Sequence, residues 1–250
     1  IREAIARARA LDPDHALSLA IRGTVRAFAE RDFAAAWRDL DRAVALDPEY
    51  SRIFRLRGQV ALAGGQVGRA IDEYDAAIER APLDGDLAAG RAWTAFLGGR
   101  TQDALKALRA AAARWPDVDT VHASLAAVAS WAGHHDEAIA AGRRTMEIDG
   151  DLPNFATTLA YAYARAGRTE EASALVARIA ASPDGPPSPS MLVPVLLALG
   201  DRAGAAAHAD LARRTDVAWR HTLDVDPRMV ELRTFTGTAP HLVLAAASVG

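Results

Sequence analysis

The chain has 250 residues, half of them apolar, and a formal net charge of −3. This balance lacks the basic excess that is typical of nucleic-acid-binding domains, so we expect no direct nucleic-acid binding. The absence of cysteine excludes disulfides and thiolate metal sites. No apolar run approaches the roughly 20 residues that a membrane-spanning helix needs, and no signal peptide opens the chain, so we expect a cytoplasmic protein without a membrane span.

The first segment, IREAIARARALDP (residues 1–13), has the spacing of the second half of a helix that ends at Pro13. We therefore expect the sequence to be a piece of a longer chain that begins within a repeat. Ile1 and Ile5 would then lack their partner helix, and an exposed apolar face of that kind favours association. A homodimer formed through this face is an alternative that stays open.

Four series of residues recur along the chain with a step of 34 and in one phase, which indicates tandem repeats of one structural unit. The first copy departs from the series: it has Arg31 in the glycine position and carries one extra residue near AERDF (residues 29–33). The four series are the alanines Ala36, Ala70, Ala104, Ala138 and Ala172; the glycines Gly65, Gly99, Gly133 and Gly167; the prolines Pro48, Pro82 and Pro116; and the small residues Gly58, Ala92, Ala126 and Ala160.

Each unit is predicted to be a pair of amphipathic helices, because apolar residues fall at three-to-four spacing in its second half. The series of small residues marks places where two helix backbones approach closely, and a larger side chain there would overpack the contact. The glycine ends the first helix of each pair in a left-handed conformation. Acids such as Asp103 and Glu137 then lie in the first turn of the second helix, where the helix dipole favours them.

This pattern resembles the tetratricopeptide repeat, and the matching residues of the best copy are Phe54, Gly58, Ala61, Ala70, Tyr74, Ala77 and Pro82. The resemblance covers residues 1–214 and implies an all-α, right-handed α-solenoid of about six helix-turn-helix units, the first one truncated, with a concave groove. Arg57 and Arg91 stand where the family usually has a large apolar residue. Gly150 and Asp184 replace the terminal proline in later copies.

The stretch GGQVGRAIDEY (residues 64–74) has glycines before a predicted helix, as phosphate-binding loops do. The lysine and the following Ser or Thr of such a loop are absent. The aligned stretches of other copies, LGGRTQDAL, WAGHHDEAI and RAGRTEEAS, keep a single turn glycine. We therefore interpret this stretch as a turn between helices.

The repeat phase breaks at the proline-rich residues 181–190, which we interpret as a hinge before a last helix pair that ends near residue 214. Residues 215–250 are predicted to be a capping segment and tail. Their signature resembles the C-terminal region of bacterial multidomain regulators, in which the repeats follow a winged-helix, cyclase or kinase domain. We expect Trp219 and Met229 to cap the core. The matching residues are Leu199, Gly200, Asp201, Trp219, Leu223, Asp226, Pro227, Arg228, Leu232 and Arg233.

The resemblance implies a groove lined by the first helix of each pair. Aromatic residues and arginine, the types enriched in binding hot spots, dominate this set, and a peptide with an acidic end and an apolar body would suit it. Packing between repeats is the alternative role of Trp93 and Trp131. The lysines that hold the C-terminal carboxylate of heat-shock chaperones in some family members have no counterpart, so that partner is not expected. The predicted groove residues are Arg52, Arg55, Gln59, Trp93, Phe96, Trp131, Tyr161 and Arg165.

Candidate chemistry outside the groove is sparse. His134, His135 and Asp136 are adjacent in a predicted turn rather than on one face, so we expect no metal site. Ser124 and Ser130 lack a nucleophile-elbow motif, and we expect no catalytic residues, no cofactor and no enzyme activity. The main hypothesis is a non-catalytic protein-interaction or sensory module of a bacterial regulator that binds a protein or peptide. A small-ligand sensor that controls an upstream output domain is the alternative.

Overall fold

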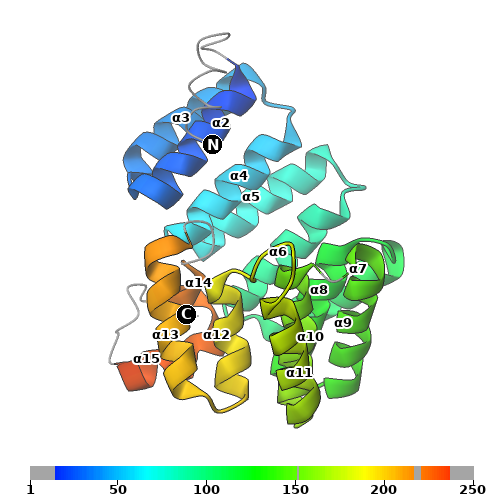
Figure 1. Ribbon diagram of the computed structural model, residues 1–250. Coiled ribbons are helices and arrows are strands. Elements are labelled where there is room, and N and C mark those ends of the chain that lie inside the picture. The colour runs from blue at the N-terminus through cyan, green and yellow to red at the C-terminus, as the bar shows by residue number, and fades with distance from the viewer. Residues whose placement is uncertain (1–14, 151, 217–220, 237–250) are drawn as a thin grey trace, which may run out of the picture. The chain divides into compact units, whose positions relative to one another are not determined.

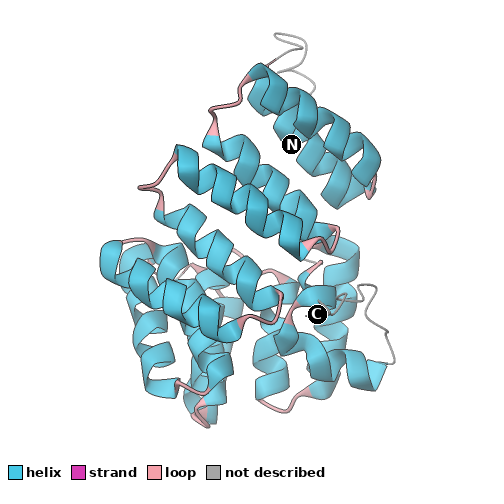
Figure 2. Ribbon diagram, turned by 180° about the vertical axis from the view of Figure 1, so that it is seen from behind, coloured by secondary structure: helices cyan, strands magenta, loops and turns pink. Residues whose placement is uncertain are grey.

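The computed structural model describes residues 15–150, 152–216 and 221–236. All regular secondary structure in these ranges is helical (Figures 1 and 2). The chain divides into two compact units, Ile1–Thr94 and Ala95–Gly250. Ile1 and Ile5, whose exposed face was predicted to associate, and Trp219 of the predicted cap lie outside the described residues.

The first unit consists of helices that follow one another as antiparallel pairs (Figure 1). The pairs α2–α3 and α4–α5 pack side by side, and α2 also contacts α4. The elements are α2 (Ala16–Val25), the π-helix η1 (Arg26–Glu30), α3 (Phe33–Leu46), α4 (Ser51–Ala63), α5 (Val67–Arg80) and most of α6 (Gly85–Leu97), which runs across the boundary between the units.

The second unit continues the pattern with three further pairs, α8–α9, α10–α11 and α12–α13, and ends in short helices that pack against the last pair. α10 contacts both α8 and α12, so the first helices of these three pairs lie in a row. The elements are α7 (Thr101–Arg114), α8 (Asp119–Ala132), α9 (His135–Asp149), α10 (Pro153–Arg165), α11 (Thr169–Ala180), α12 (Pro189–Ala198), α13 (Arg202–Thr215), α14 (Thr222–Val225), the 3-10 helix η2 (Pro227–Met229) and α15 (Val230–Thr236).

The 34-residue alanine series occupies equivalent positions, as predicted. Ala36, Ala70, Ala104, Ala138 and Ala172 each lie in the first turns of the second helix of a pair, and each has 0% exposure. The small residues of the first helices are buried as well. A Cβ added to Gly58 would lie 2.9 Å from the Tyr74 ring, which is closer than carbon atoms approach without displacement. These contacts give the sequence period its physical cause, because a larger side chain would push the paired helices apart.

The turn glycines also behave as predicted. Gly65, Gly99, Gly133 and Gly167 all have φ between 76° and 85°, the left-handed region that costs little only for glycine. Arg31, which stands in the same position of the first copy, adopts φ 59°. Among the described residues it is the one non-glycine residue with positive φ. The repeat geometry therefore imposes the left-handed turn even where the side chain opposes it.

The extra residue of the first copy is accommodated in a π-helix. Gly23 precedes Gly58 by 35 residues, whereas Arg31 precedes Gly65 by the usual 34. The insertion therefore lies between residues 23 and 31, and η1 spans Arg26–Glu30 in this interval. A π-turn holds one more residue than an α-turn, so it absorbs a single insertion without changing the turn that follows.

Arg57, which replaces an apolar residue of the repeat pattern, is held by two carboxylates. It donates hydrogen bonds to Asp41 in α3 at 2.6 Å and to Glu73 in α5 at 2.7 Å, and its guanidinium lies 5.2 Å from the Trp37 ring centre. Because Arg57 and Glu73 expose only 13% and 11% of their side chains, this is a nearly buried ion pair between paired helices.

The same position is an arginine in the neighbouring repeats of this unit. Arg22, the equivalent of Arg57 in the first copy, pairs with Asp39, and Arg91 in the next copy pairs with Asp75 at 2.9 Å. Asp41 and Asp75 are themselves one repeat apart. An ion pair at the helix contact thus recurs with the repeat, which explains how arginine replaces the usual apolar residue.

The C-terminal signature residues that the structure describes have structural roles. The Asp226 carboxylate has 0% exposure, accepts a hydrogen bond from the backbone N–H of Arg228 at 2.9 Å, and forms an ion pair with the Arg228 side chain at 2.7 Å. Arg233 donates to the backbone carbonyls of Leu223 and Asp226. These bonds fix η2 and the start of α15 as one compact turn.

The same turn is anchored to the last helix pair by an apolar cluster. Met229 has 1% exposure and belongs to this cluster together with Leu223 and Leu232. The side chains on α12 and α13 that complete it are Val193, Leu197, Ala205, Ala209 and Ala212. The C-terminal helices therefore cover apolar surface of α12 and α13 that would otherwise be exposed.

Candidate functional site

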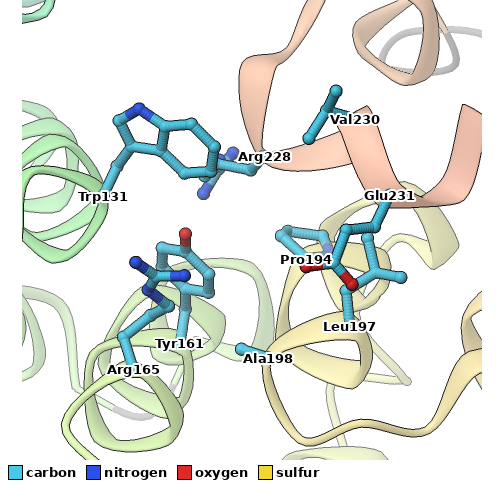
Figure 3. A pocket seen from close by; sticks show the side chains of 9 residues that line it. All are labelled: Trp131, Tyr161, Arg165, Pro194, Leu197, Ala198, Arg228, Val230 and Glu231. Atoms are coloured by element: carbon cyan, nitrogen blue, oxygen red, sulfur yellow. The ribbon is translucent and has the colours of Figure 1, made fainter. Parts of the chain in front are cut away.

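Four of the eight predicted groove residues belong to the second unit, and three of these line one pocket (Figure 3). Trp131 lies at the end of α8, and Tyr161 and Arg165 lie one turn apart on α10. The pocket has a volume of about 160 Å³. Its other lining residues are Pro194, Leu197 and Ala198 of α12, Arg228 of η2, and Val230 and Glu231 of α15.

Trp131 forms one wall of the pocket and is itself contacted by two side chains. The Phe96 and Trp131 rings pack edge to face, with centroids 6.5 Å apart and planes at 71°. The Arg165 guanidinium lies 5.7 Å from the centre of the same ring. Cation–π contact and edge-to-face packing together hold the indole in place.

Phe96 was predicted to line the groove, and its burial corrects that expectation. Its side chain has 0% exposure, so no partner reaches it. The helix that carries it turns this residue toward the core, where it packs against Trp131. Phe96 therefore supports a pocket residue and does not contact a ligand itself.

Tyr161 presents a polar group in a mostly apolar setting. Its side chain is 97% covered, and burial raises the pKa of its hydroxyl to about 12, although the charges of Arg228 and Arg165 oppose this rise. The hydroxyl therefore stays protonated at any physiological pH. Figure 3 shows it directed toward Trp131 and Arg228. It makes no hydrogen bond with another described residue.

Arg228 closes the pocket on the side of the C-terminal turn. Its guanidinium lies 5.2 Å from the centre of the Tyr161 ring, and its ion pair with Asp226 leaves only 10% of its side chain exposed. Burial alone would lower the pKa of Arg228, but the Asp226 carboxylate more than offsets this effect and raises it. Arg228 therefore forms part of the pocket wall with its charge balanced by Asp226, and its contact with Tyr161 connects η2 to α10.

Two exposed charged groups flank the pocket, Arg165 on α10 and Glu231 on α15. Neither forms an ion pair within the described ranges. Between them lie the apolar side chains of Pro194, Leu197 and Val230, and Val230 is 49% exposed. The arrangement can bind an apolar side chain and hold a negative and a positive group at different rims.

The other four predicted residues lie in the first unit. Arg52 is exposed, and Arg55, Gln59 and Trp93 are half-buried. Arg55 and Gln59 act on the buried Tyr74: burial raises the pKa of its hydroxyl to about 12, while the charge of Arg55 and a hydrogen bond with Gln59 oppose the rise. A partner-binding role for these four residues stays a prediction.

Sequence reasoning missed the walls that α12, η2 and α15 contribute. Arg228 was noticed as part of the C-terminal signature, but nothing in its spacing places it beside Tyr161, 67 positions earlier. Pro194 lies inside α12 and was not singled out at all. The one available signal was that a capping segment must lie against the last repeats.

The histidine cluster does not form a ligand set in the structure. His134 occupies the N-cap position of α9 without a side-chain capping hydrogen bond, and His135 is the first residue of the helix. No group of three or more His, Asp or Glu side chains with metal-ligand geometry occurs in the ranges that the structure describes. Within the same ranges, no helix has both the length and the apolarity to cross a membrane.

Comparison with known proteins identifies the repeat. The family model described as tetratricopeptide repeat matches residues 25–85 and 86–153, together more than half of the chain. None of the curated proteins matches the sequence.

Several solved structures share the fold at low sequence identity. A thermophilic TPR protein of Thermus thermophilus is 21% identical, with a TM-score of 0.59 over 72% of this chain and 97% of that chain. A tetratricopeptide repeat protein from Parabacteroides merdae is 14% identical, with a TM-score of 0.61 over 88% of both chains. PilF of Pseudomonas aeruginosa is 15% identical, with a TM-score of 0.55 over 88% of this chain and 97% of that chain. The predicted all-α solenoid of tandem helix pairs is confirmed, and the chain belongs to the tetratricopeptide repeat family.

Proposed function

We propose that this chain is a non-catalytic protein-interaction module, and that the pocket between Trp131, Tyr161 and Arg165 is where it binds a segment of a partner protein. The observation that carries the proposal is the convergence of a tryptophan held by a cation–π contact, a tyrosine and an exposed arginine on one pocket with apolar and charged walls. These three residue types dominate binding hot spots in protein interfaces.

The size of the pocket favours a side chain over a free metabolite or drug-sized ligand. Small-molecule sites usually enclose about 300–1,000 Å³, whereas this pocket measures about 160 Å³. A cavity of about 150 Å³ holds one benzene-sized group. The pocket therefore fits one large apolar side chain, and the rest of the partner segment would lie along the surface outside it.

The wider role is inferred from the C-terminal signature. Its resemblance to bacterial multidomain regulators supports a sensory or interaction part of a larger cytoplasmic regulator, in which binding at the pocket is transmitted to an output domain. The ion pair of Arg228 with Asp226 and the contact of Arg228 with Tyr161 connect the signature to the pocket. Binding of a small ligand in the pocket remains the alternative.

Selection of a phage-displayed library of random twelve-residue peptides against the full chain tests the proposal. We expect enriched peptides whose affinity falls at least tenfold for Trp131→Ala, because truncating a central hot spot costs about 2 kcal/mol or more. Trp115→Ala is the matched control: Trp115 is also half-buried and stacked by an arginine, Arg114 at 4.7 Å, but lies outside the pocket.

The outcomes separate the two candidate functions. Equal loss of affinity in Trp131→Ala and Trp115→Ala would place the site elsewhere. Failure to enrich any peptide would contradict the protein-interaction proposal. In that case a rise in melting temperature with a small metabolite, lost in Trp131→Ala, would support the sensor alternative instead.

A further inference from the structure

The charges on the pocket rim carry an inference about the partner segment, which rests on the proposed function. Arg165 is the exposed cation of the pocket, and its guanidinium lies 5.7 Å from the centre of the Trp131 ring. A cation–π contact does not use the N–H groups in the guanidinium plane, which can still bind a carboxylate. No carboxylate within the described ranges pairs with it, and its exposed N–H groups can donate to a carboxylate of a ligand.

The Tyr161 hydroxyl provides a second donor at the same end of the pocket. Residues four apart on a helix lie on one face, and the charge of Arg165 acts on the Tyr161 hydroxyl. The guanidinium and the neutral hydroxyl can both donate hydrogen bonds to a carboxylate, and the bond from the guanidinium is charge-assisted.

The opposite rim carries the reverse charge. Glu231 extends from α15, on a different wall from Arg165 (Figure 3), is exposed, and pairs with no cation among the described residues. Val230, beside it, is 49% exposed and lines the pocket. A ligand that covered Val230 would bring its next group to Glu231, where a basic group is attracted and an acidic one repelled.

We propose that the pocket binds an internal stretch of a partner protein in which an acidic, a large apolar and a basic residue follow one another. Arg165 and Tyr161 hold the acidic residue, the apolar walls hold the large apolar residue, and Glu231 holds the basic residue. An internal stretch satisfies both rims, because the chain continues on either side of the apolar anchor.

The test is to repeat the library selection with a charge-reversed pocket. Peptides enriched by the wild type should carry an acidic residue on one side of a large apolar residue and a basic residue on the other. Arg165→Glu should lose the acidic preference and select a basic residue in its place. Arg114→Glu, which reverses an exposed arginine stacked on Trp115 outside the pocket, should select the wild-type pattern.

A second measurement does not depend on the folding of any variant. One enriched peptide is synthesised as selected, with its acidic residue changed to the amide, and with its basic residue changed to Gln. Each change should weaken binding to the wild-type chain severalfold, because each removes a charged pair at an exposed rim of the pocket. Enriched peptides without the charge pattern, or an unchanged selection by Arg165→Glu, would overturn this inference while leaving peptide binding intact. No enrichment by the wild type would overturn the proposed function itself.

Discussion

Arg31 and Gly65 occupy the same turn in successive repeats and share a left-handed backbone, with φ 59° and 76°. The sequence differs, yet the turn is preserved, because the two helices of each pair must reverse direction at this point. The Asp32 carboxylate accepts a hydrogen bond from the N–H of Ala35 at 2.9 Å and caps the following helix. This cap stabilises the start of α3 in the copy that lacks the glycine.

Replacing Arg31 by glycine is expected to stabilise the chain, because a side chain in the left-handed region costs about 1–2 kcal/mol. Part of the gain is offset by the greater freedom of glycine in the unfolded state, so the net rise should be about 1 kcal/mol or less. Gly133→Ala is the reverse experiment. Its methyl group would meet nothing within 4 Å, so any loss of stability comes from the left-handed backbone conformation alone. Urea unfolding should show opposite shifts, and shifts of the same sign would contradict the prediction.

Replacement by alanine should have opposite effects on stability at Gly90, which packs against Tyr74, and at Gly68, which has open space around it. A Cβ at Gly90 would lie 2.6 Å from the Tyr74 ring, which is buried, so Gly90→Ala should lower the free energy of unfolding by about 1–3 kcal/mol. A Cβ at Gly68, exposed on α5, meets nothing, so Gly68→Ala should raise it by about 1 kcal/mol. Thermal unfolding of both variants measures the difference. Equal tolerance of both would mean that the helices do not approach as closely as described.

The recurring arginine predicts unequal costs at equivalent positions. Arg57→Ala leaves Glu73, which is 11% exposed, with only the longer contact to Arg69 at 3.7 Å, and should cost about 2 kcal/mol. Arg91 and Asp75 expose 30% and 47% of their side chains, so Arg91→Ala should cost about 1 kcal/mol or less. Denaturant unfolding of the two variants tests this order. A larger cost at Arg91 would contradict it.

The pair Asp119–Asp149 predicts a dependence of stability on pH. A hydrogen bond with Asp119, burial and the charge of Asp119 raise the pKa of Asp149 from 3.8 to about 6. The folded chain then binds more protons than the unfolded chain between these values, so this group's contribution to stability falls as pH rises from about 4 through 6. Asp149→Asn should raise the melting temperature at neutral pH and flatten its pH profile. A variant with the wild-type profile would show that Asp149 ionises normally.

The repeat framework was predictable because each of its constraints is local and recurs. A buried alanine, a turn glycine and a small residue at a helix contact all leave a mark at a fixed spacing, and the structure places Ala70, Ala104 and Ala138 alike. The π-helix in the first copy was visible only as a one-residue slip. The shift in spacing shows where the extra residue is inserted, but it does not predict that the helix continues through the insertion as a π-helix.

The pocket was predictable only in part, because its two halves lie on segments far apart in the sequence. Trp131, Tyr161 and Arg165 were placed by the repeat phase. The direction of Phe96 depends on the rotation of α6, which the spacing of its apolar residues does not define, since nearly all of the residues around it are buried. The wall made by Arg228 and Glu231 depends on how the C-terminal turn folds back, which no periodicity describes.

Hydrogen–deuterium exchange of the full chain, with and without an enriched peptide, tests the central claim most directly. The proposal predicts slower exchange on peptide binding in α8, α10 and α12 and in the turn from η2 to α15, with α3 and α5 unchanged. Slower exchange confined to residues 15–94, or to α7, α9 and α11, would contradict the assignment of the binding site to the pocket of Trp131, Tyr161 and Arg165.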